Sequence, residues 1–256
     1  MIRIIKRGHV LRVSLDREAK LNALTVAMWH DLARAFKEAD ADEDLRLVVL
    51  EGAGDRAFCV GADIAEFETS RAGKAQAMSY AKTIFAGVEA IEHCRHPTIA
   101  LIRGYCVGGG LEVAAACDMR IAREGSRFGV PVRKLGLPVD YPELAALRRL
   151  VGPANALEIL FEGRVFDAQE ALQKGLINRI LPEAEFEQEC SQIIERIVTG
   201  APLVARWHKA MVRRLDDPAP LSAEERDAPF ATFDTEDYRI GTRAFLDKSE
   251  PEFVGR

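Results

Sequence analysis

The chain has 256 residues and a formal net charge of −5, from 35 basic and 40 acidic side chains. This balance argues against a general nucleic-acid-binding protein, which carries a basic surface. The N-terminal Ile2-Arg3-Ile4-Ile5-Lys6 is too short and too charged for a signal peptide, and no apolar run approaches the roughly 18 residues that span a bilayer. We therefore expect a cytoplasmic protein with no nucleic-acid or membrane partner.

The cysteines and histidines give no metal motif. The five cysteines show no C-x-x-C spacing, so we expect reduced, mostly buried thiols. His93 and His96 flank Cys94, but Pro97 ends the helix there, and a cationic helix end explains these residues better than a metal site. The sequence thus predicts no metal centre.

Strands and helices alternate in the first half of the chain. Apolar runs predict a β-hairpin from residues 2–6 and 10–15, and further strands over 47–50, 98–102 and 119–122. Helical spacing predicts one helix that begins after the N-cap Thr25 and another over 77–91. This alternation favours an α/β layered core.

The second half of the chain is mainly helical. Two short helices are expected over 144–151 and 154–161, separated by Gly152-Pro153. From Glu183 onward the pattern predicts only helices, over 184–198, 202–214, 223–232 and 236–247. We expect an α/β core with the active site over residues 1–200 and a helical region over residues 201–256.

A glycine-rich turn, Gly108-Gly109-Gly110, joins the strand at 98–102 to a helix over 111–116. Without Cβ atoms, the turn lets a ligand carbonyl approach the free N–H groups of the new helix. Such donors suit an oxygen that gains negative charge during a reaction. Glu112, in the first helical turn, lies close to that oxygen. From the residues alone, a close helix–strand crossing is an equal alternative, with Glu112 favoured by the positive helix end.

Three segments together resemble the crotonase family, the enoyl-CoA hydratases and isomerases. They are Leu21-Asn22-Ala23-Leu24, Phe58 to Ile64, and Gly104 to Asp118. Segments 168–178 and 235–246 also match family features, so the resemblance runs from about residue 3 to residue 255. It implies a spiral of repeated ββα units whose helical C-terminal region mediates assembly into a homotrimer or hexamer. It also implies an acyl-CoA substrate in fatty acid metabolism, with coenzyme A as part of the substrate and no separate cofactor.

The resemblance also implies site residues. By motif position, the N–H groups of Ala62 and Gly109 would form the oxyanion hole for a thioester enolate. Coenzyme A and the acyl group would contact a larger set around the same segments: Ala19, Lys20, Leu21, Ala23, Arg56, Val60, Gly61, Asp63, Ile64 and Gly108. For Lys20 and Arg56, a solvated surface charge is the alternative. Phe245 and Lys248 resemble residues that some members place around the adenine.

One departure from the family concerns the reaction itself. In the hydratases two glutamates flank the bound water; the first aligns with Glu112 and the second falls at Val132, which cannot transfer a proton. Asp140 is the nearest substitute, in a glycine-led loop where some related isomerases and dehalogenases have an aspartate. A position near an apolar acyl pocket would raise the pKa of Asp140. The alternative is that Asp140 caps the following helix, with Glu143 at N3.

We therefore predict an enoyl-CoA hydratase/isomerase-type enzyme, a lyase or isomerase, that forms an enolate stabilised by the oxyanion hole. Glu112 and Asp140 are the predicted acid/base residues, and isomerisation by proton shift fits them better than hydration. Two alternatives stay open. One is an acyl-CoA hydrolase or dehalogenase with Asp140 as nucleophile; the other is a CoA-binding member of the family without turnover.

Overall fold

The structure, a computed structural model, describes the whole chain, residues 1–256, and is built on two β-sheets. The larger sheet has six strands in the order β1 (Ile2–Arg7), β2 (Val10–Leu15), β3 (Leu47–Gly52), β5 (Thr98–Ile102), β7 (Met119–Arg123) and β10 (Arg179–Leu181). The smaller sheet has the order β4 (Ala57–Cys59), β6 (Tyr105–Val107), β8 (Arg127–Gly129) and β9 (Phe166–Asp167). Only the β1–β2 hairpin and the β8–β9 pair are antiparallel.

The chain repeats one ββα unit. Strands β3, β5 and β7 of the large sheet are each followed by a short strand of the small sheet and then by helical structure. The helices of this part are α1 (Val26–Ala41), α2 (Phe67–Ser70), α3 (Lys74–His93), α4 (Gly109–Ala116), α5 (Tyr141–Glu162) and α6 (Ala168–Gln173). The α/β prediction and the spiral of ββα units are confirmed.

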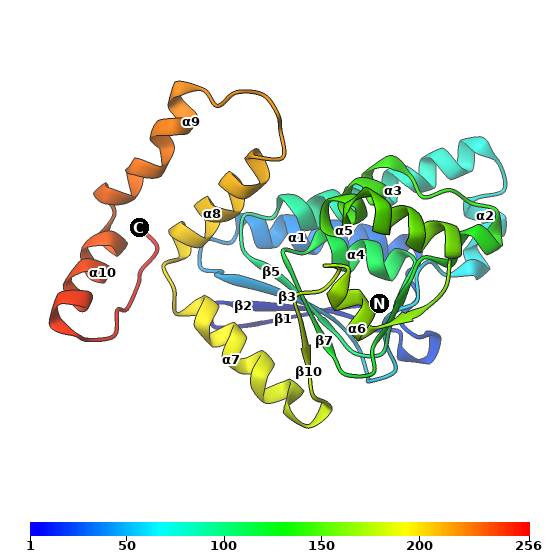
Figure 1. Cartoon of the computed structure of the whole chain (residues 1–256), viewed down its shortest axis with the longest axis horizontal. Helices are drawn as coiled ribbons and strands as arrows, with labels where there is room; N and C mark the ends of the chain where they lie inside the picture. The colour runs from blue at the N-terminus through cyan, green and yellow to red at the C-terminus, as the bar shows by residue number, and fades with distance from the viewer.

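Both faces of the central strands β3 and β5 are buried, which explains why these strands are nearly continuous apolar runs. In β3, Val48 and Leu50 belong to the main core with α1, α3, α4 and α5, while Leu47 and Val49 face a second cluster with α7 (Phe186–Val198). This alternation follows from the two-residue period of a strand. Figure 1 shows the sheet between these two helical layers.

The C-terminal helices extend to one side of this body, as Figure 1 shows in yellow to red. They are α8 (Pro202–Arg214), α9 (Ala223–Asp227) and α10 (Glu236–Asp247). Lys209 and Arg213 of α8 bind the carboxylate of Asp118 at 2.7 and 3.0 Å, which ties this region to the core. None of the helices has the length and apolar content needed to cross a membrane.

Most predicted elements are observed with small changes in their ends. Strand 98–102 and helices 202–214 and 236–247 have the predicted bounds. The predicted break at Gly152-Pro153 is also present: Gly152 has φ 74° and interrupts the helical geometry of α5. The helix expected over 223–232 is instead the short α9 followed by a 3-10 helix, Ala228–Asp234.

Gly110 allows α4 to pack against β4. A Cβ atom at Gly110 would lie 2.2 Å from the carbonyl oxygen of Cys59, a backbone atom that cannot rotate away. Gly241 of α10 offers a comparison, because its Cβ would meet only the Phe253 ring, at 3.3 Å. The first glycine is therefore required by the fold, and the second is not.

We expect Gly110→Ala to lower the free energy of unfolding by about 1–3 kcal/mol, because the added methyl group overpacks the contact with β4. For Gly241→Ala, the free energy of unfolding should stay within about 1 kcal/mol of the wild-type value. Alanine is more favourable than glycine in a helix by about that amount. Urea unfolding followed by circular dichroism measures both. Equal effects of the two substitutions would contradict this account of Gly110.

Candidate active site

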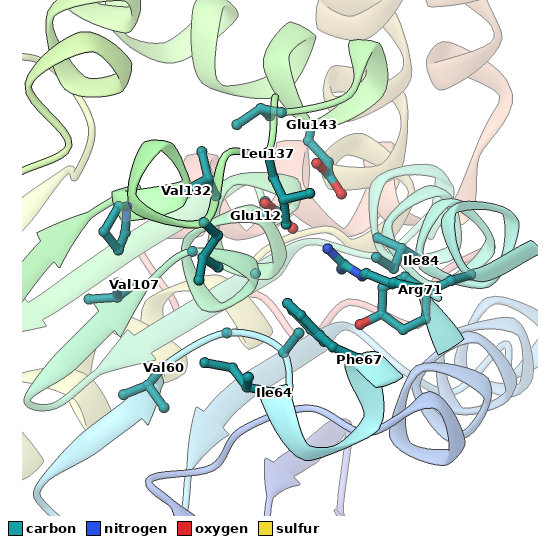
Figure 2. A pocket seen from close by; sticks show the side chains of 18 of the residues that line it. Val60, Ile64, Phe67, Arg71, Ile84, Val107, Glu112, Val132, Leu137 and Glu143 are labelled. Carbon is teal, nitrogen blue, oxygen red and sulfur yellow. The ribbon is translucent and has the colours of Figure 1, made fainter. Parts of the chain in front are cut away.

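A cavity of about 170 Å³ lies at the end of β6 in the smaller sheet and is lined by residues of, or next to, helices α1 to α5 (Figure 2). Twelve of its twenty lining residues are hydrophobic, as expected for a pocket that holds an acyl group. Seven of the site residues predicted from the sequence line it: Val60, Gly61, Ala62, Ile64, Gly108, Gly109 and Glu112. The others, including Asp140, do not.

The loop that contains Ala19, Lys20, Leu21 and Ala23 lies beside this cavity wall. Leu24 N–H donates to the carbonyl oxygen of Gly61 at 2.8 Å, and Asp63 N–H donates to that of Leu24 at 2.8 Å. Buried Asn22 fixes the loop, because its Nδ2 donates to the carbonyl oxygens of Ala53 and Ala57 at 2.9 and 2.8 Å. The two segments therefore form one continuous surface.

Three charged residues from the sequence prediction lie around this surface. Asp63 is paired with Arg17 at 2.8 Å, and this hydrogen bond lowers the pKa of the Asp63 carboxyl. Arg56 is exposed and donates to the carbonyl oxygen of Glu18 at 3.2 Å. Lys20 is exposed, without an ion pair. Asp63 is thus a structural brace, while Lys20 and Arg56 are open to an anionic ligand.

Two backbone donors border the cavity from different elements. Ala62 N–H has no acceptor within the chain. Gly109 is the first residue of α4, so its N–H has no intrahelical acceptor either. A Cβ on Gly109 would lie 3.5 Å from Gly61 Cα, which shows how closely the two turns approach. Both residues line the cavity, so these two free donors border the same space.

Two glutamates share the cavity. Glu112 comes from the first turn of α4 and Glu143 from the first turn of α5, and Figure 2 shows both carboxyl groups directed into the same space. Burial raises the pKa of Glu112 well above its usual value, and the neighbouring Glu143 raises it further. Burial also raises the pKa of Glu143, and hydrogen bonding to Asp140 N–H and to Glu112 offsets part of this increase. The pair therefore retains a proton more readily than two solvated carboxyls do.

Asp140 has a different environment from the one that the sequence suggested. It is the exposed N-cap of α5, and its carboxylate accepts from Tyr141 N–H at 2.8 Å. Glu143 completes the capping box through Asp140 N–H. The helix-cap alternative is thus what the structure has, and the acid/base or nucleophilic role of Asp140 stays a prediction. Val132 does line the cavity, in a 3-10 helix (Pro131–Leu135).

Sequence reasoning considered Glu143 only as a helix cap. The capping motif was the sequence feature that could have indicated Glu143 as a site residue. A glutamate at N3 lies in the first turn of α5, shortly after the loop 137–139 that lines the cavity. What the sequence did not contain is the packing of α5 against α4, which brings Glu143 to Glu112.

Comparisons with known proteins agree with the fold. The family model "Enoyl-CoA hydratase/isomerase" matches residues 6–256. The structure of an enoyl-CoA hydratase/carnithine racemase from Magnetospirillum magneticum superposes with a TM-score of 0.98 at 45% identity, covering 100% of this chain and 96% of that chain. A carnitinyl-CoA dehydratase from Proteus mirabilis is 32% identical, with 100% and 98% covered. A short-chain-enoyl-CoA hydratase from Clostridium acetobutylicum is also 32% identical, with 96% and 95% covered.

The raised pKa values of the two glutamates predict a pH-dependent stability. The folded protein binds protons at Glu112 and Glu143 more tightly than the unfolded chain does, so this stabilisation is complete below about pH 4.5 and is lost as the pH rises through the raised values. Glu112→Gln mimics the protonated carboxyl. We therefore expect the free energy of unfolding of this variant, relative to wild type, to increase as the pH rises from about 4.5 through the raised pKa values.

The control is Glu68→Gln, which removes an exposed glutamate in α2. Its difference from wild type should not change over the same range. Urea unfolding at several pH values provides the measurement, and parallel curves for wild type and Glu112→Gln would refute the shared proton.

Proposed function

The chain belongs to the enoyl-CoA hydratase/isomerase family and is an enzyme that acts on acyl-CoA; on this premise we propose that it hydrates 2-enoyl-CoA thioesters reversibly. The observation that carries the proposal is the pair Glu112–Glu143, placed in an apolar cavity beside two free backbone N–H groups. Hydration needs an acid and a base at once, and two carboxyls that share one proton supply both.

The proposed mechanism begins at the thioester. Its carbonyl oxygen accepts from Ala62 N–H and Gly109 N–H, which stabilise the enolate that forms; a donor of this kind contributes roughly 3–4 kcal/mol. Ionised Glu143 takes a proton from water, and the hydroxide oxygen bonds to C3 of the substrate. Protonated Glu112 then delivers its proton to C2 of the enolate. Glu112 is the acid because its pKa is raised by both burial and its neighbour.

We further propose that coenzyme A lies along the surface formed by residues 19–24 and 60–64. The backbone bonds between these segments provide a continuous wall, and the exposed Lys20 and Arg56 are free to bind phosphate groups. Asp63 holds this wall through Arg17, so its role is structural rather than a contact with the ligand.

The C-terminal region supports a proposal about assembly. Its helices expose several large apolar side chains, as an interface does before its partner is bound: Val212, Leu215, Phe230, Phe233, Tyr238, Phe245 and Leu246. We propose that this region joins three copies of the chain into a homotrimer.

The hydratase proposal predicts that crotonyl-CoA loses its enoyl absorbance in the presence of the wild-type protein. Glu112→Gln and Glu143→Gln should each lower kcat by about 10²–10⁴-fold, because each removes a positioned acid or base. Asp140→Asn is the matched control: asparagine caps a helix as well as aspartate, so only the charge is lost, and kcat should change little.

Other outcomes have distinct meanings. A large loss of rate in Asp140→Asn, with Glu143→Gln active, would move the second acid/base role back to Asp140. Conversion of 3-butenoyl-CoA to crotonyl-CoA without hydration would identify an isomerase. Release of free coenzyme A with a mass adduct on Asp140 would identify a hydrolase.

The assembly proposal predicts a molar mass of three chains in light scattering after size-exclusion chromatography. The double substitution Phe230→Asp, Phe233→Asp should shift this mass to a smaller species, because a charge in an apolar interface is costly. The control is Tyr105→Asp, because Tyr105 is exposed in β6, away from the C-terminal helices. This substitution should leave the mass unchanged. A monomeric wild-type protein would contradict the proposal.

A further inference from the structure

The cavity contains one cationic side chain, Arg71, which follows α2. Its guanidinium carbon lies 4.4 Å from the ring centre of Phe67 and 4.1 Å from that of Tyr80. Figure 2 shows the guanidinium directed into the cavity, on the same side as Glu112 and Glu143. Two aromatic rings therefore hold the planar group in place.

No carboxylate of the chain forms an ion pair with this cation. Arg71 forms no ion pair within 4.0 Å, and its buried Nε has no hydrogen-bond acceptor. Trp29, which also lines the cavity, has a buried Nε1 without an acceptor. A buried charged donor left without a partner costs more free energy than a neutral one. Such donors indicate a ligand that supplies oxygen acceptors.

Glu112 and Glu143 are not the missing partners of Arg71. Neither carboxyl lies within 4.0 Å of an Arg71 side-chain nitrogen, and the charge of Arg71 only partly offsets the effect of burial, which raises both pKa values. The thioester carbonyl is not the partner either, because it has the N–H groups of Ala62 and Gly109 under the proposed function. Under the proposed function, coenzyme A lies along the surface that includes residues 60–64. In Figure 2, Arg71 and Val60 lie on opposite sides of the cavity, so Arg71 faces the end of the acyl group that is far from coenzyme A.

We propose that the acyl group accepted by this cavity ends in a carboxylate, which pairs with Arg71. A carboxylate offers two oxygens to the forked donors of a guanidinium and cancels its charge. The substrate class is thus a 2-enoyl-CoA derived from a dicarboxylic acid. This inference rests on the proposed function for the reaction, but the contact with Arg71 concerns binding alone.

The test uses three substrates that differ only at C4: 4-carboxy-2-butenoyl-CoA, crotonyl-CoA and 4-trimethylammonio-2-butenoyl-CoA. For wild type, kcat/KM should be about 10- to 100-fold higher for the carboxylate than for crotonyl-CoA, the range expected for a hydrogen bond to a charged group. The trimethylammonium substrate should be the poorest, because Arg71 repels it.

Arg71→Met should remove the preference for the carboxylate while keeping activity on crotonyl-CoA, with the change in KM rather than in kcat. Arg71→Lys should restore part of the preference because it restores the charge. Lys74→Met is the matched control: it removes an exposed cation at the start of α3, outside the cavity, and should leave the preference unchanged.

Calorimetry with unreactive glutaryl-CoA and valeryl-CoA separates this inference from the proposed function. Tighter binding of glutaryl-CoA that is lost in Arg71→Met supports the carboxylate contact even if no hydration is found. Equal binding of the two thioesters by wild type overturns it. An equal loss of rate in Arg71→Met on all three enoyl substrates, with a shifted pH profile, would also overturn it and assign Arg71 to the glutamate pair.

Discussion

The approach of two glycine turns is the constraint on which the site depends. Gly110 allows α4 to touch the backbone of Cys59, and Gly61 and Gly109 meet beside it. Through this contact, the N–H groups of Ala62 and Gly109, which come from separate elements, border the same cavity, and Glu112 follows within one helical turn. A larger side chain at Gly110 would move the donors and the carboxyl together. The packing of glycine against backbone therefore fixes the electrostatics of the cavity as well as its shape.

The cavity combines groups that would be costly separately. A buried carboxyl retains its proton, and a second carboxyl nearby reinforces this effect. Arg71 brings a positive charge into the same volume without joining the pair. Apolar walls strengthen each of these interactions, because the local dielectric is low. Under the two proposals, Glu112 and Glu143 transfer protons and Arg71 recognises the charge of the acyl group.

The sequence was sufficient for features that depend on local pattern. Strand 98–102, helix 202–214 and the break at Gly152 follow from apolar runs, proline and glycine. The glycine turn beside Glu112 could also be located, because three consecutive glycines predict a turn whose backbone can be approached closely. The role of Glu143 could not, because α4 and α5 meet only through long-range packing. Arg71 gave no signal either: an arginine in a polar segment has the same pattern whether it faces solvent or a cavity.

Glu143 has a second function that links chemistry to motion. The same carboxylate that hydrogen-bonds Glu112 also accepts from Asp140 N–H and lies at the positive end of α5. A proton that reaches Glu143 weakens this cap, so proton transfer and the order of the first turn of α5 are thermodynamically linked. The adjoining residues 137–139 form part of the cavity wall. The stability of that part of the wall is therefore linked to the protonation state of Glu143.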